Sequence, residues 1–388
     1  MSTIPYGRQY IDADDIEAVV ETLKSDFLTQ GPKVPEFEAA ISNYVGSNFT
    51  VAVSSATAAL HIACLALDVG PNDWVWTSPI SFVASANCAI YCGAKVDFVD
   101  IDARSFNLCP IRLKEKLEKA KLEDKLPKVV IPIHMAGSAP DLSAIHELSK
   151  EYGFKVIEDA SHAIGAKMQN SKVGACEYSD ITVFSFHPVK IITTGEGGAC
   201  TTNNKNLANR MQRLRSHGIT RNQDEMTEAS HGPWYYQQVE LGFNYRLTDL
   251  QAALGISQLK KIENAVARRN QIVSRYNNEF ESHVVTPLIP SMGRSAFHLY
   301  IVQLDEEMTN TKKSKLALTL RENGVGSNLH YIPIHTQPYY RQFGFKLGDY
   351  PISESYYRRA LSLPLFPSMT EEQITHVIQT FKKSISEL

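Results

Sequence analysis

Lys190 is the residue in this sequence with the clearest capacity for covalent chemistry. It follows the apolar run 181–184 and stands shortly before the glycine-rich stretch 193–198. An amine near the end of a strand can form a Schiff base with an aldehyde, and glycines let a cofactor approach the backbone closely. Because most lysines are solvated surface residues, Lys190 needs supporting residues before it predicts a site.

Asp159 supplies that support. It ends the apolar run 156–158, where a carboxylate must be solvated, paired or hydrogen-bonded. Pyridoxal phosphate requires a carboxylate beside its ring nitrogen, because the protonated ring can then accept electrons from a carbanion. His162, shortly after Asp159, could lie against such a ring. The alternatives are an aspartate that caps the next helix and an ordinary helical histidine.

Two further segments suit the other ends of this cofactor. Residues 54–57 (Ser-Ser-Ala-Thr) stand between a predicted strand and a predicted helix, where free amides and the helix dipole favour a phosphate. Hydroxyls of Thr57 and Ser185 could add donors, and Phe82 could stack on a flat ring. Helix capping and core packing are the plainer interpretations of these side chains.

Asp100 and Asp102 form a competing motif. Two aspartates at this spacing can hold a divalent cation in a sugar-nucleotide glycosyltransferase, since hard cations prefer carboxylate oxygens. The motif is short, and alternation of Asp with Val and Ile is typical of a half-exposed strand end, so we expect no metal site. The six cysteines form no CxxC pair, and we expect reduced, mostly buried thiols.

Strands that alternate with helices position these residues. The alternation predicts an α/β fold with a largely parallel sheet, in which ligands collect at the carboxyl ends of the strands. The predicted strands are residues 51–53, 74–77, 96–99, 129–133, 156–158, 181–184 and 198–201. The predicted helices are residues 13–24, 33–45, 57–67, 82–91, 142–152 and 206–215.

The last third of the chain has a different character. A long helical pattern over 248–279 leads to Val/Ile runs, proline-rich loops and two further helical patterns at 311–323 and 370–386. This region predicts a smaller α+β domain. The chain then divides into an N-terminal arm at 1–30, a large cofactor-binding α/β domain at 31–260 and a small C-terminal domain at 261–388.

Composition excludes several classes of protein. The chain has 388 residues, 43% hydrophobic and 21% charged, which is ample for packed cores and unlike a disordered polymer. The 39 Lys and Arg residues balance 42 Asp and Glu residues, which argues against a nucleic-acid partner. No apolar run reaches the ~18–20 residues of a membrane helix. The first residues carry no export signal, so we expect a cytoplasmic protein.

Taken together, these motifs resemble those of the DegT/DnrJ/EryC1/StrS sugar aminotransferases, a family of fold-type I pyridoxal-phosphate enzymes. The resemblance implies a large domain with a mostly parallel seven-stranded sheet between helices, plus a smaller C-terminal α+β domain. It extends over nearly the whole chain, through the segments 6–9, 28–32, 54–61, 158–163, 184–198, 242–252, 330–335 and 361–364.

The resemblance also implies roles for the residues around the cofactor ring. By that similarity Lys190 forms the Schiff base with pyridoxal 5'-phosphate, and Asp159 pairs with the ring nitrogen. His162 and Phe82 would pack near the ring.

The same similarity implies which residues bind the phosphate group of the cofactor. Ala56, Thr57 and Ser185 would hold it. Asn244 would reach the phosphate bound by a neighbouring subunit, which implies a homodimer with active sites at the subunit interface. Many family members have glycine where this chain has Ala56, so the backbone approach there departs from the family pattern.

Several short sequence segments resemble those of one branch of the family. That branch makes UDP-4-amino-4,6-dideoxy-N-acetyl-β-L-altrosamine on the route to pseudaminic acid, a sugar placed on bacterial flagellins. That branch transfers an amino group from L-glutamate to C4 of a UDP-linked 4-keto-6-deoxy-N-acetyl-L-hexosamine (UDP-2-acetamido-2,6-dideoxy-β-L-arabino-hexos-4-ulose). The similarity places a further set of residues on the sugar side: Tyr6, Asp26, Phe27, Leu28, Thr29, Gln30, Arg246, Asn328, Leu329, His330 and Tyr331.

Other functions stay open on the sequence alone. The amino acceptor could be a different nucleotide-linked keto sugar. A sugar dehydratase of the same fold would carry histidine at the Schiff-base position, where this chain has Lys190. A metal-dependent glycosyltransferase would use Asp100 and Asp102. A non-catalytic regulatory relative is disfavoured because both Lys190 and Asp159 are present.

Overall fold

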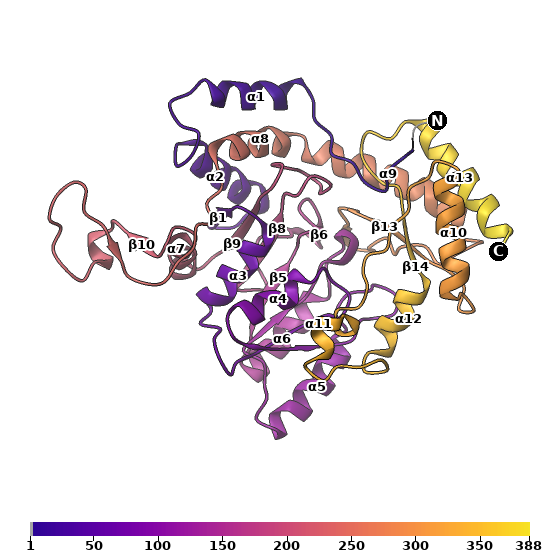
Figure 1. Ribbon diagram of the computed structural model, residues 1–388, viewed down its shortest axis with the longest axis horizontal. Helices are drawn as coiled ribbons and strands as arrows, with labels where there is room; N and C mark the ends of the chain where they lie inside the picture. The colour runs from indigo at the N-terminus through magenta and orange to yellow at the C-terminus, as the bar shows by residue number, and fades with distance from the viewer. Residues whose placement is uncertain (1–2) are drawn as a thin grey trace.

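A seven-stranded sheet forms the centre of the computed structural model, which describes residues 3–388 (Figure 1). The strand order is β1-β9-β8-β5-β4-β2-β3; β9 is antiparallel to both of its neighbours, and the other neighbouring strands are parallel. The predicted mostly parallel sheet of seven strands is therefore confirmed. Its strands are β1 (Phe49–Val53), β2 (Trp74–Thr77), β3 (Lys95–Phe98), β4 (Val129–Ile131), β5 (Lys155–Asp159), β8 (Ile181–Ser185) and β9 (Gly198–Thr202).

Helices cover both faces of this sheet. Successive side chains of its strands therefore point into two different hydrophobic cores, one on each face. Ile157 of β5 and Val183 of β8 pack on the face covered by α3, α4 and α7, whereas Val156 and Phe184 pack on the opposite face. The helices of the two layers are α2 (Lys33–Val45), α3 (Ala56–Ala66), α4 (Ala84–Tyr91), α5 (Pro110–Leu122), α6 (Leu142–Tyr152), α7 (Lys205–Leu214) and α8 (Asp249–Lys260).

The predicted helix over 248–279 is two helices, α8 and α9 (Ile262–Phe280), which corrects the single long element expected there. They meet at Lys261, whose φ of −103° and ψ of 0° lie outside the α-helical region. The Lys261 ammonium is held by the carboxylates of Asp12 and Asp15 at 2.6 and 2.7 Å. These contacts attach the N-terminal helix α1 (Ala13–Leu23) to the junction of α8 and α9.

A second hydrophobic core lies in the C-terminal part of the chain. It joins α9 to the antiparallel pair β13–β14 and to the helices α10 and α13. The division of the chain at residues 30 and 260 stays a prediction. The elements of this part are β13 (Tyr300–Gln303), α10 (Asn310–Glu322), α11 (Pro338–Arg341), α12 (Pro351–Arg359), β14 (Ala360–Leu363) and α13 (Glu371–Ser386).

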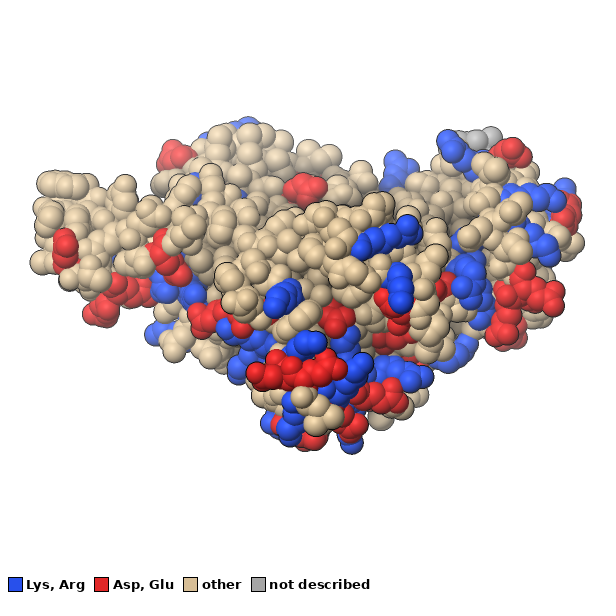
Figure 2. Space-filling model, turned by 60° about the horizontal axis from the view of Figure 1, so that its bottom comes forward, with Lys and Arg blue, Asp and Glu red and all other residues tan. Residues whose placement is uncertain are grey.

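A long hairpin projects from the body of the molecule beside α7 (Figure 1). It contains β10 (Ile219–Thr220) and β11 (Gln237–Gln238). Charged residues of both signs mingle on the lower end of the face in Figure 2, and no large area of one sign is seen on that face. The remaining short elements are β6 (Lys167–Met168), β7 (Ser171–Lys172), β12 (Gly293–Arg294) and the 3₁₀ turns η1 (Met135–Gly137), η2 (Gln223–Glu225) and η3 (Ile334–Thr336).

Two expectations concern the whole described chain. Within residues 3–388, no helix has the length and apolar character needed to cross a membrane. All six cysteines are free thiols, and only Cys109 has appreciable exposure. This agrees with the expected reduced, mostly buried thiols.

Phe280→Ala tests the C-terminal core. Phe280 has 0% exposure, and its ring lies 5.4 Å from that of Tyr276 and 4.9 Å from that of Phe381. The substitution leaves a cavity and should lower the free energy of unfolding by about 3–5 kcal/mol in urea titrations. Phe343→Ala, at a side chain with 49% exposure, is the control and should cost only about 0.5 kcal/mol. Equal losses in the two variants would contradict this assignment of the core.

Candidate active site

A cavity of about 580 Å³ opens at the carboxyl ends of β5 and β8, beside the N-terminus of α3. Twelve of the predicted site residues line it together, although they come from segments far apart in the sequence. They are Tyr6, Ala56, Thr57, Phe82, Asp159, His162, Ser185, Lys190, Asn328, Leu329, His330 and Tyr331.

Asp159 ends β5 and is fixed by two serines. Its Oδ2 accepts a hydrogen bond from Ser85 Oγ at 2.6 Å, and its Oδ1 accepts from the amide and hydroxyl of Ser161 at 3.1 and 2.6 Å. Both oxygens accept hydrogen bonds, as those of an ionised carboxylate do. A turn follows Asp159, so the alternative interpretation as a helix cap is wrong. Asp159 instead presents a rigidly held anion to the cavity.

Lys190 enters the same cavity from the loop between β8 and β9. Backbone hydrogen bonds from Phe186 to Gly197 and from Thr194 to Phe186, at 2.9 and 3.0 Å, close the base of that loop. Within residues 3–388 the Lys190 ammonium has no recorded hydrogen bond or ion pair. Burial lowers its pKa to about 8, an effect that the negative charge of Asp159 partly opposes. At pH 7 about a tenth of such amines are neutral, far more than for an ordinary lysine.

The N-terminus of α3 forms an anion cradle. Ser55 caps the helix, and its side chain accepts a hydrogen bond from Ala58 N at 3.1 Å, so the capping interpretation holds for that serine. The amides of Ala56 and Thr57 belong to the first turn, where no partner exists within a helix. Strand β9 lies very close to this helix end: a Cβ added to Gly198 would stand only 2.6 Å from Ala56 N. Two free amides and a helix dipole therefore face the cavity beside Ser185.

Two histidines form the wall near Asp159. The rings of His162 and His298 have centroids 4.5 Å apart, and His162 Nε2 lies 3.0 Å from the hydroxyl of Tyr331. Burial, followed by the charge of Lys190, holds the pKa of both imidazoles well below the usual value of 6.5. Both rings are thus neutral near pH 7, and they add no positive charge beside Lys190. His162 lies in a turn, so its interpretation as a helical histidine is wrong.

Aromatic and polar side chains line the other side of the cavity. Phe82 is 58% exposed and is therefore no core residue; its ring lies 6.2 Å from that of Tyr331. His330 packs 5.1 Å from the ring of Tyr6, and its Nδ1 lies 2.8 Å from Ser362 Oγ. Contacts to β14 and to the N-terminal segment therefore hold these side chains in place.

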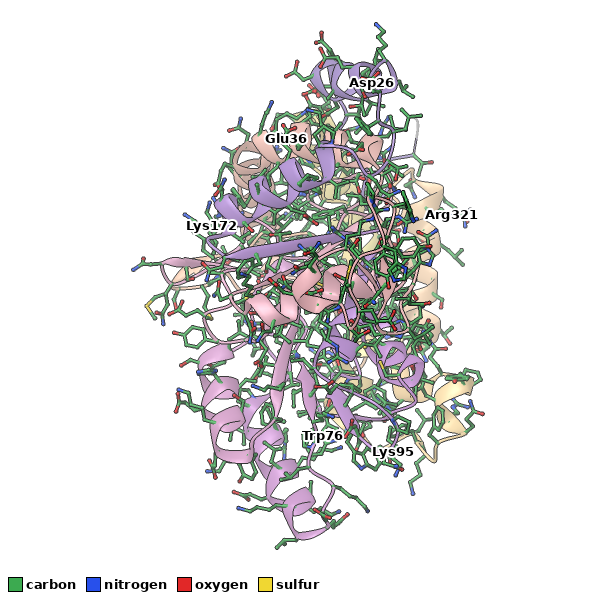
Figure 3. All side chains as sticks on the ribbon, turned by 90° about the vertical axis from the view of Figure 1, so that its left-hand side faces the viewer. Asp26, Glu36, Trp76, Lys95, Lys172 and Arg321 are labelled. Atoms are coloured by element: carbon green, nitrogen blue, oxygen red, sulfur yellow. The ribbon has the colours of Figure 1, made fainter. Side chains whose placement is uncertain are left out.

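The remaining predicted residues do not line the cavity of the same chain. The segment Asp26–Gln30 lies beside the start of α8, where Asp249 N donates to Leu28 O at 3.0 Å. Figure 3 shows Asp26 at the outer end of the molecule. Asn244 pairs with Ser216, and Arg246 Nη1 donates to Ser216 Oγ at 3.2 Å. Their assignment to the active site stays a prediction.

Three side chains at the site escaped the sequence analysis. Ser85 and Ser161 bind Asp159, and His298 packs on His162. The spacing Asp159-x-Ser161 is a weak signal of an aspartate turn, and it could have been noticed. Ser85 and His298 reach the site only through tertiary packing, and no local pattern marks them.

The carboxylates of Asp100 and Asp102, the competing metal motif, form hydrogen bonds with the backbone. The Asp100 carboxylate accepts hydrogen bonds from the amides of Ile352 and Ser353, both at 2.9 Å, at the start of α12. Asp102 accepts from the amides of Arg104 and Ser105 at 3.0 and 2.8 Å. The backbone thus engages both carboxylate oxygens of Asp100 and Oδ1 of Asp102. Across residues 3–388, moreover, no cluster of His, Cys, Asp and Glu is arranged to hold a metal ion.

Comparisons with known proteins agree with this geometry. Residues 9–382 match the DegT/DnrJ/EryC1/StrS aminotransferase family. The spore coat polysaccharide biosynthesis protein SpsC of Bacillus subtilis is 38% identical over 98% of this chain and 96% of its own. The UDP-4-amino-4,6-dideoxy-N-acetyl-beta-L-altrosamine transaminase of Campylobacter jejuni is 36% identical over 97% of this chain and 96% of its own.

Solved structures show the same fold. Helicobacter pylori PseC, an aminotransferase of pseudaminic acid biosynthesis, superimposes with a TM-score of 0.90 at 29% identity, with 100% of both chains covered. The sugar aminotransferase Spr1654 of Streptococcus pneumoniae, in its PMP form, has a TM-score of 0.89 at 28% identity and covers 99% of this chain and 98% of its own. The present chain belongs to the DegT/DnrJ/EryC1/StrS aminotransferase family, and its activity is sugar transamination with pyridoxal phosphate.

The residues present fit this cofactor on physical grounds. Its phosphate matches the free amides of Ala56 and Thr57, and a pyridinium matches the fixed carboxylate of Asp159. The unpaired, half-buried amine of Lys190 matches an aldehyde. The roles that the sequence analysis assigned to these side chains stay predictions.

Gly198→Ala tests the anion cradle. The added Cβ would stand 2.6 Å from the amide of Ala56 and displace the first turn of α3. We expect the affinity for pyridoxal phosphate, measured by titration of the apoprotein, to fall about tenfold, the equivalent of ~1.4 kcal/mol. Gly70→Ala is the matched control, because a Cβ there has no heavy atom within 4 Å. Equal affinity in the two variants would refute a cradle at this helix end.

The pKa of Lys190 predicts a pH profile. Only the neutral amine reacts with an amine-directed reagent, so labelling of Lys190 in the apoprotein should rise about tenfold per pH unit below its pKa of about 8 and level off above it. Peptide mass spectrometry measures the rate. In Asp159→Asn the midpoint should move to lower pH, because the lost negative charge had raised this pKa. A higher midpoint in that variant would contradict the assigned electrostatics.

Proposed function

We propose that this aminotransferase transfers the amino group of L-glutamate to C4 of UDP-2-acetamido-2,6-dideoxy-β-L-arabino-hexos-4-ulose, a step of pseudaminic acid biosynthesis that serves flagellin glycosylation. The observation that carries this proposal is the 36% identity, over 97% of the chain, to the altrosamine transaminase of Campylobacter jejuni. The fold of Helicobacter pylori PseC supports the same substrate. A cytoplasmic location stays a prediction.

Lys190 performs the proton transfers in this proposal. Its neutral amine takes the proton from Cα of L-glutamate and later delivers a proton to C4 of the sugar, as general base and then general acid. When bound, pyridoxal phosphate supplies the electron-accepting ring and carries the amino group between the two substrates. Asp159, held by Ser85 and Ser161, keeps a proton on the ring nitrogen. His162 and His298 exclude water on one side as neutral rings.

A homodimer with active sites at the subunit interface is part of the proposal. Helix α1 packs its polar residues Asp15 and Thr22 inward and exposes Ile16, Val20 and Leu23, by 59%, 38% and 55%. A second copy of this chain would cover that apolar face.

Charge gives an independent reason for a second copy. Among the described residues that line the cavity, Lys190 is the only lysine or arginine. The diphosphate of a nucleotide sugar requires more positive charge than one amine supplies. Arg246, which lies outside the cavity of its own chain, could supply it to a neighbour, and Asn244 could reach the neighbour's phosphate site.

A different nucleotide-linked keto sugar is the second candidate acceptor. The chain is 38% identical to SpsC, a protein of spore coat polysaccharide biosynthesis. This identity favours a different acceptor as strongly as the 36% identity to the altrosamine transaminase favours the L-arabino sugar. The two acceptors need the same chemistry at Lys190 and Asp159, and they differ only in sugar contacts. A comparison of kcat/KM for the two keto sugars therefore decides between them.

A substrate panel tests the proposed function. The holoenzyme is incubated with ¹⁵N-labelled L-glutamate and a series of UDP-linked 4-keto-6-deoxy sugars, and the products are identified by mass spectrometry and NMR. We expect ¹⁵N at C4 of the L-arabino substrate, with the highest kcat/KM in the series. Lys190→Ala should abolish turnover because it removes the proton-transferring amine. A higher kcat/KM for another keto sugar would replace the first candidate by the second.

A further inference from the structure

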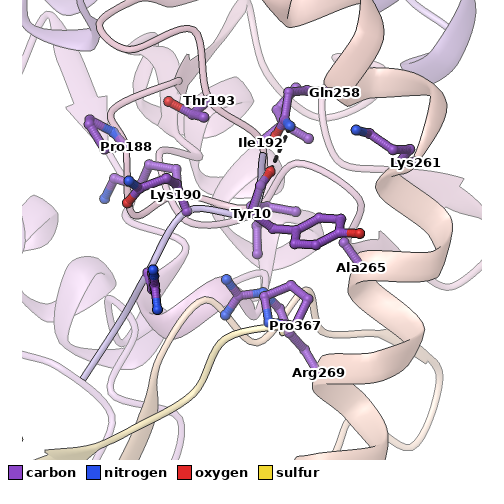
Figure 4. A pocket seen from close by; sticks show the side chains of 13 residues that line it. Tyr10, Pro188, Lys190, Ile192, Thr193, Gln258, Lys261, Ala265, Arg269 and Pro367 are labelled. Atoms are coloured by element: carbon purple, nitrogen blue, oxygen red, sulfur yellow. Dashed lines mark hydrogen bonds between the residues drawn. The ribbon is translucent and has the colours of Figure 1, made fainter. Parts of the chain in front are cut away.

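A small, strongly positive cavity lies next to the loop that carries Lys190 (Figure 4). It is bounded by the N-terminal segment 8–10, the loop residues 190–193 and helix α9, and its volume is about 20 Å³. Lys190 is the only residue that it shares with the active-site cavity. The two cavities are therefore distinct and share only this residue.

The lining of this cavity is positive without a compensating acid. Arg8, Lys190, Lys261 and Arg269 contribute to it, and none of the thirteen lining residues of the described chain is acidic. Lys261 is neutralised by its two aspartate partners. The other three cations have no ion pair within residues 3–388. Arg8 is exposed to solvent, and Lys190 is the amine assigned to the cofactor aldehyde, so Arg269 is the buried cation of this cavity that lacks a counter-ion.

Arg269 is the most deeply buried cation of this cavity. It is 1% exposed, and Figure 4 shows its guanidinium extending from α9 into the pocket. Its Nη1 donates to three carbonyl oxygens at 3.3, 3.2 and 3.0 Å, those of Phe297, His298 and Leu365. Its Nε is buried and has no partner among the described residues. Carbonyls satisfy donors but leave the charge uncompensated, and a buried charge without a counter-ion is costly.

The volume restricts what can compensate this charge. A space of about 20 Å³ holds one particle of the size of a water molecule, which needs ~10–15 Å³. A water molecule would satisfy Arg269 Nε but would leave the charge of the guanidinium uncompensated. A monatomic anion meets both requirements.

We propose that the cavity between Arg269 and the Lys190 loop binds one halide ion, with chloride as the physiological occupant. The anion accepts a hydrogen bond from Arg269 Nε and compensates the guanidinium inside the fold. Because Lys190 lines the same cavity, the anion also offsets part of the positive charge beside the reactive amine. Chloride thereby stabilises the folded protein through a site that contacts neither substrate.

Bromide locates such a site directly. Crystals of the holoenzyme are grown with sodium bromide in place of sodium chloride, and anomalous diffraction is recorded at the bromine edge. We expect a bromide peak within hydrogen-bond distance of Arg269 Nε. A water molecule at this position, or bromide only at other positions, would overturn the proposal.

Thermal unfolding of the holoenzyme tests the site in solution. We expect Tm to rise and saturate as sodium chloride replaces sodium gluconate at constant ionic strength, because chloride binds only the folded state. Arg269→Lys removes the Nε donor and should shift the chloride concentration at half-saturation at least about tenfold upward, the equivalent of ~1.4 kcal/mol.

Arg275→Lys is the matched control for this measurement. Arg275 lies on the same helix, but its Nη1 is paired with Glu371 at 2.5 Å, so the chloride response should be unchanged. A linear response without saturation, or the same response in both variants, would refute a specific halide site. Should Arg269→Lys fail to fold, the bromide crystals of the unmodified protein decide the question alone.

Discussion

The register between the parallel strands β5 and β8 is the constraint on which the active site depends. Asp159, the last residue of β5, lies opposite Val183, two residues before the end of β8. The loop that leaves β8 then returns Lys190 over the same edge of the sheet. Because successive side chains of a strand face opposite sides, a slip of one residue would turn Asp159 to the face on which Glu158 now pairs with His134. Backbone pairing thus determines which acid faces the amine.

Burial determines the charges at this edge. The acid is surrounded by donors, the amine is partly desolvated, and the two histidines are neutral. The environment therefore places one carboxylate and one amine beside two neutral rings. A buried amine whose pKa is lowered to about 8 is typical of enzymes that transfer protons near neutral pH.

The sequence predicted the strands well because each is an apolar run with turn-forming residues at its ends. Helix α5 was not predicted: only Leu113, Leu117 and Ala120 are buried along its length, and its other residues are mostly charged. The break at Lys261 was missed, and its ion-pair partners Asp12 and Asp15 lie about 250 residues away in the sequence. Lys190 and Asp159 were visible because they stand next to strands. Ser85 and His298 were not, because only tertiary packing brings them to the cavity.

Asp100 has a mechanical consequence for the molecule. Its carboxylate binds the first amides of α12 and the hydroxyl of Ser353 at 2.6 Å, while Asp97 accepts from Tyr350 at 2.9 Å. Hydrogen bonds to a charged acceptor contribute about 1.5–3 kcal/mol each. These hydrogen bonds hold the end of the edge strand β3 against the start of α12, so separating the two elements here would cost several such contacts at once.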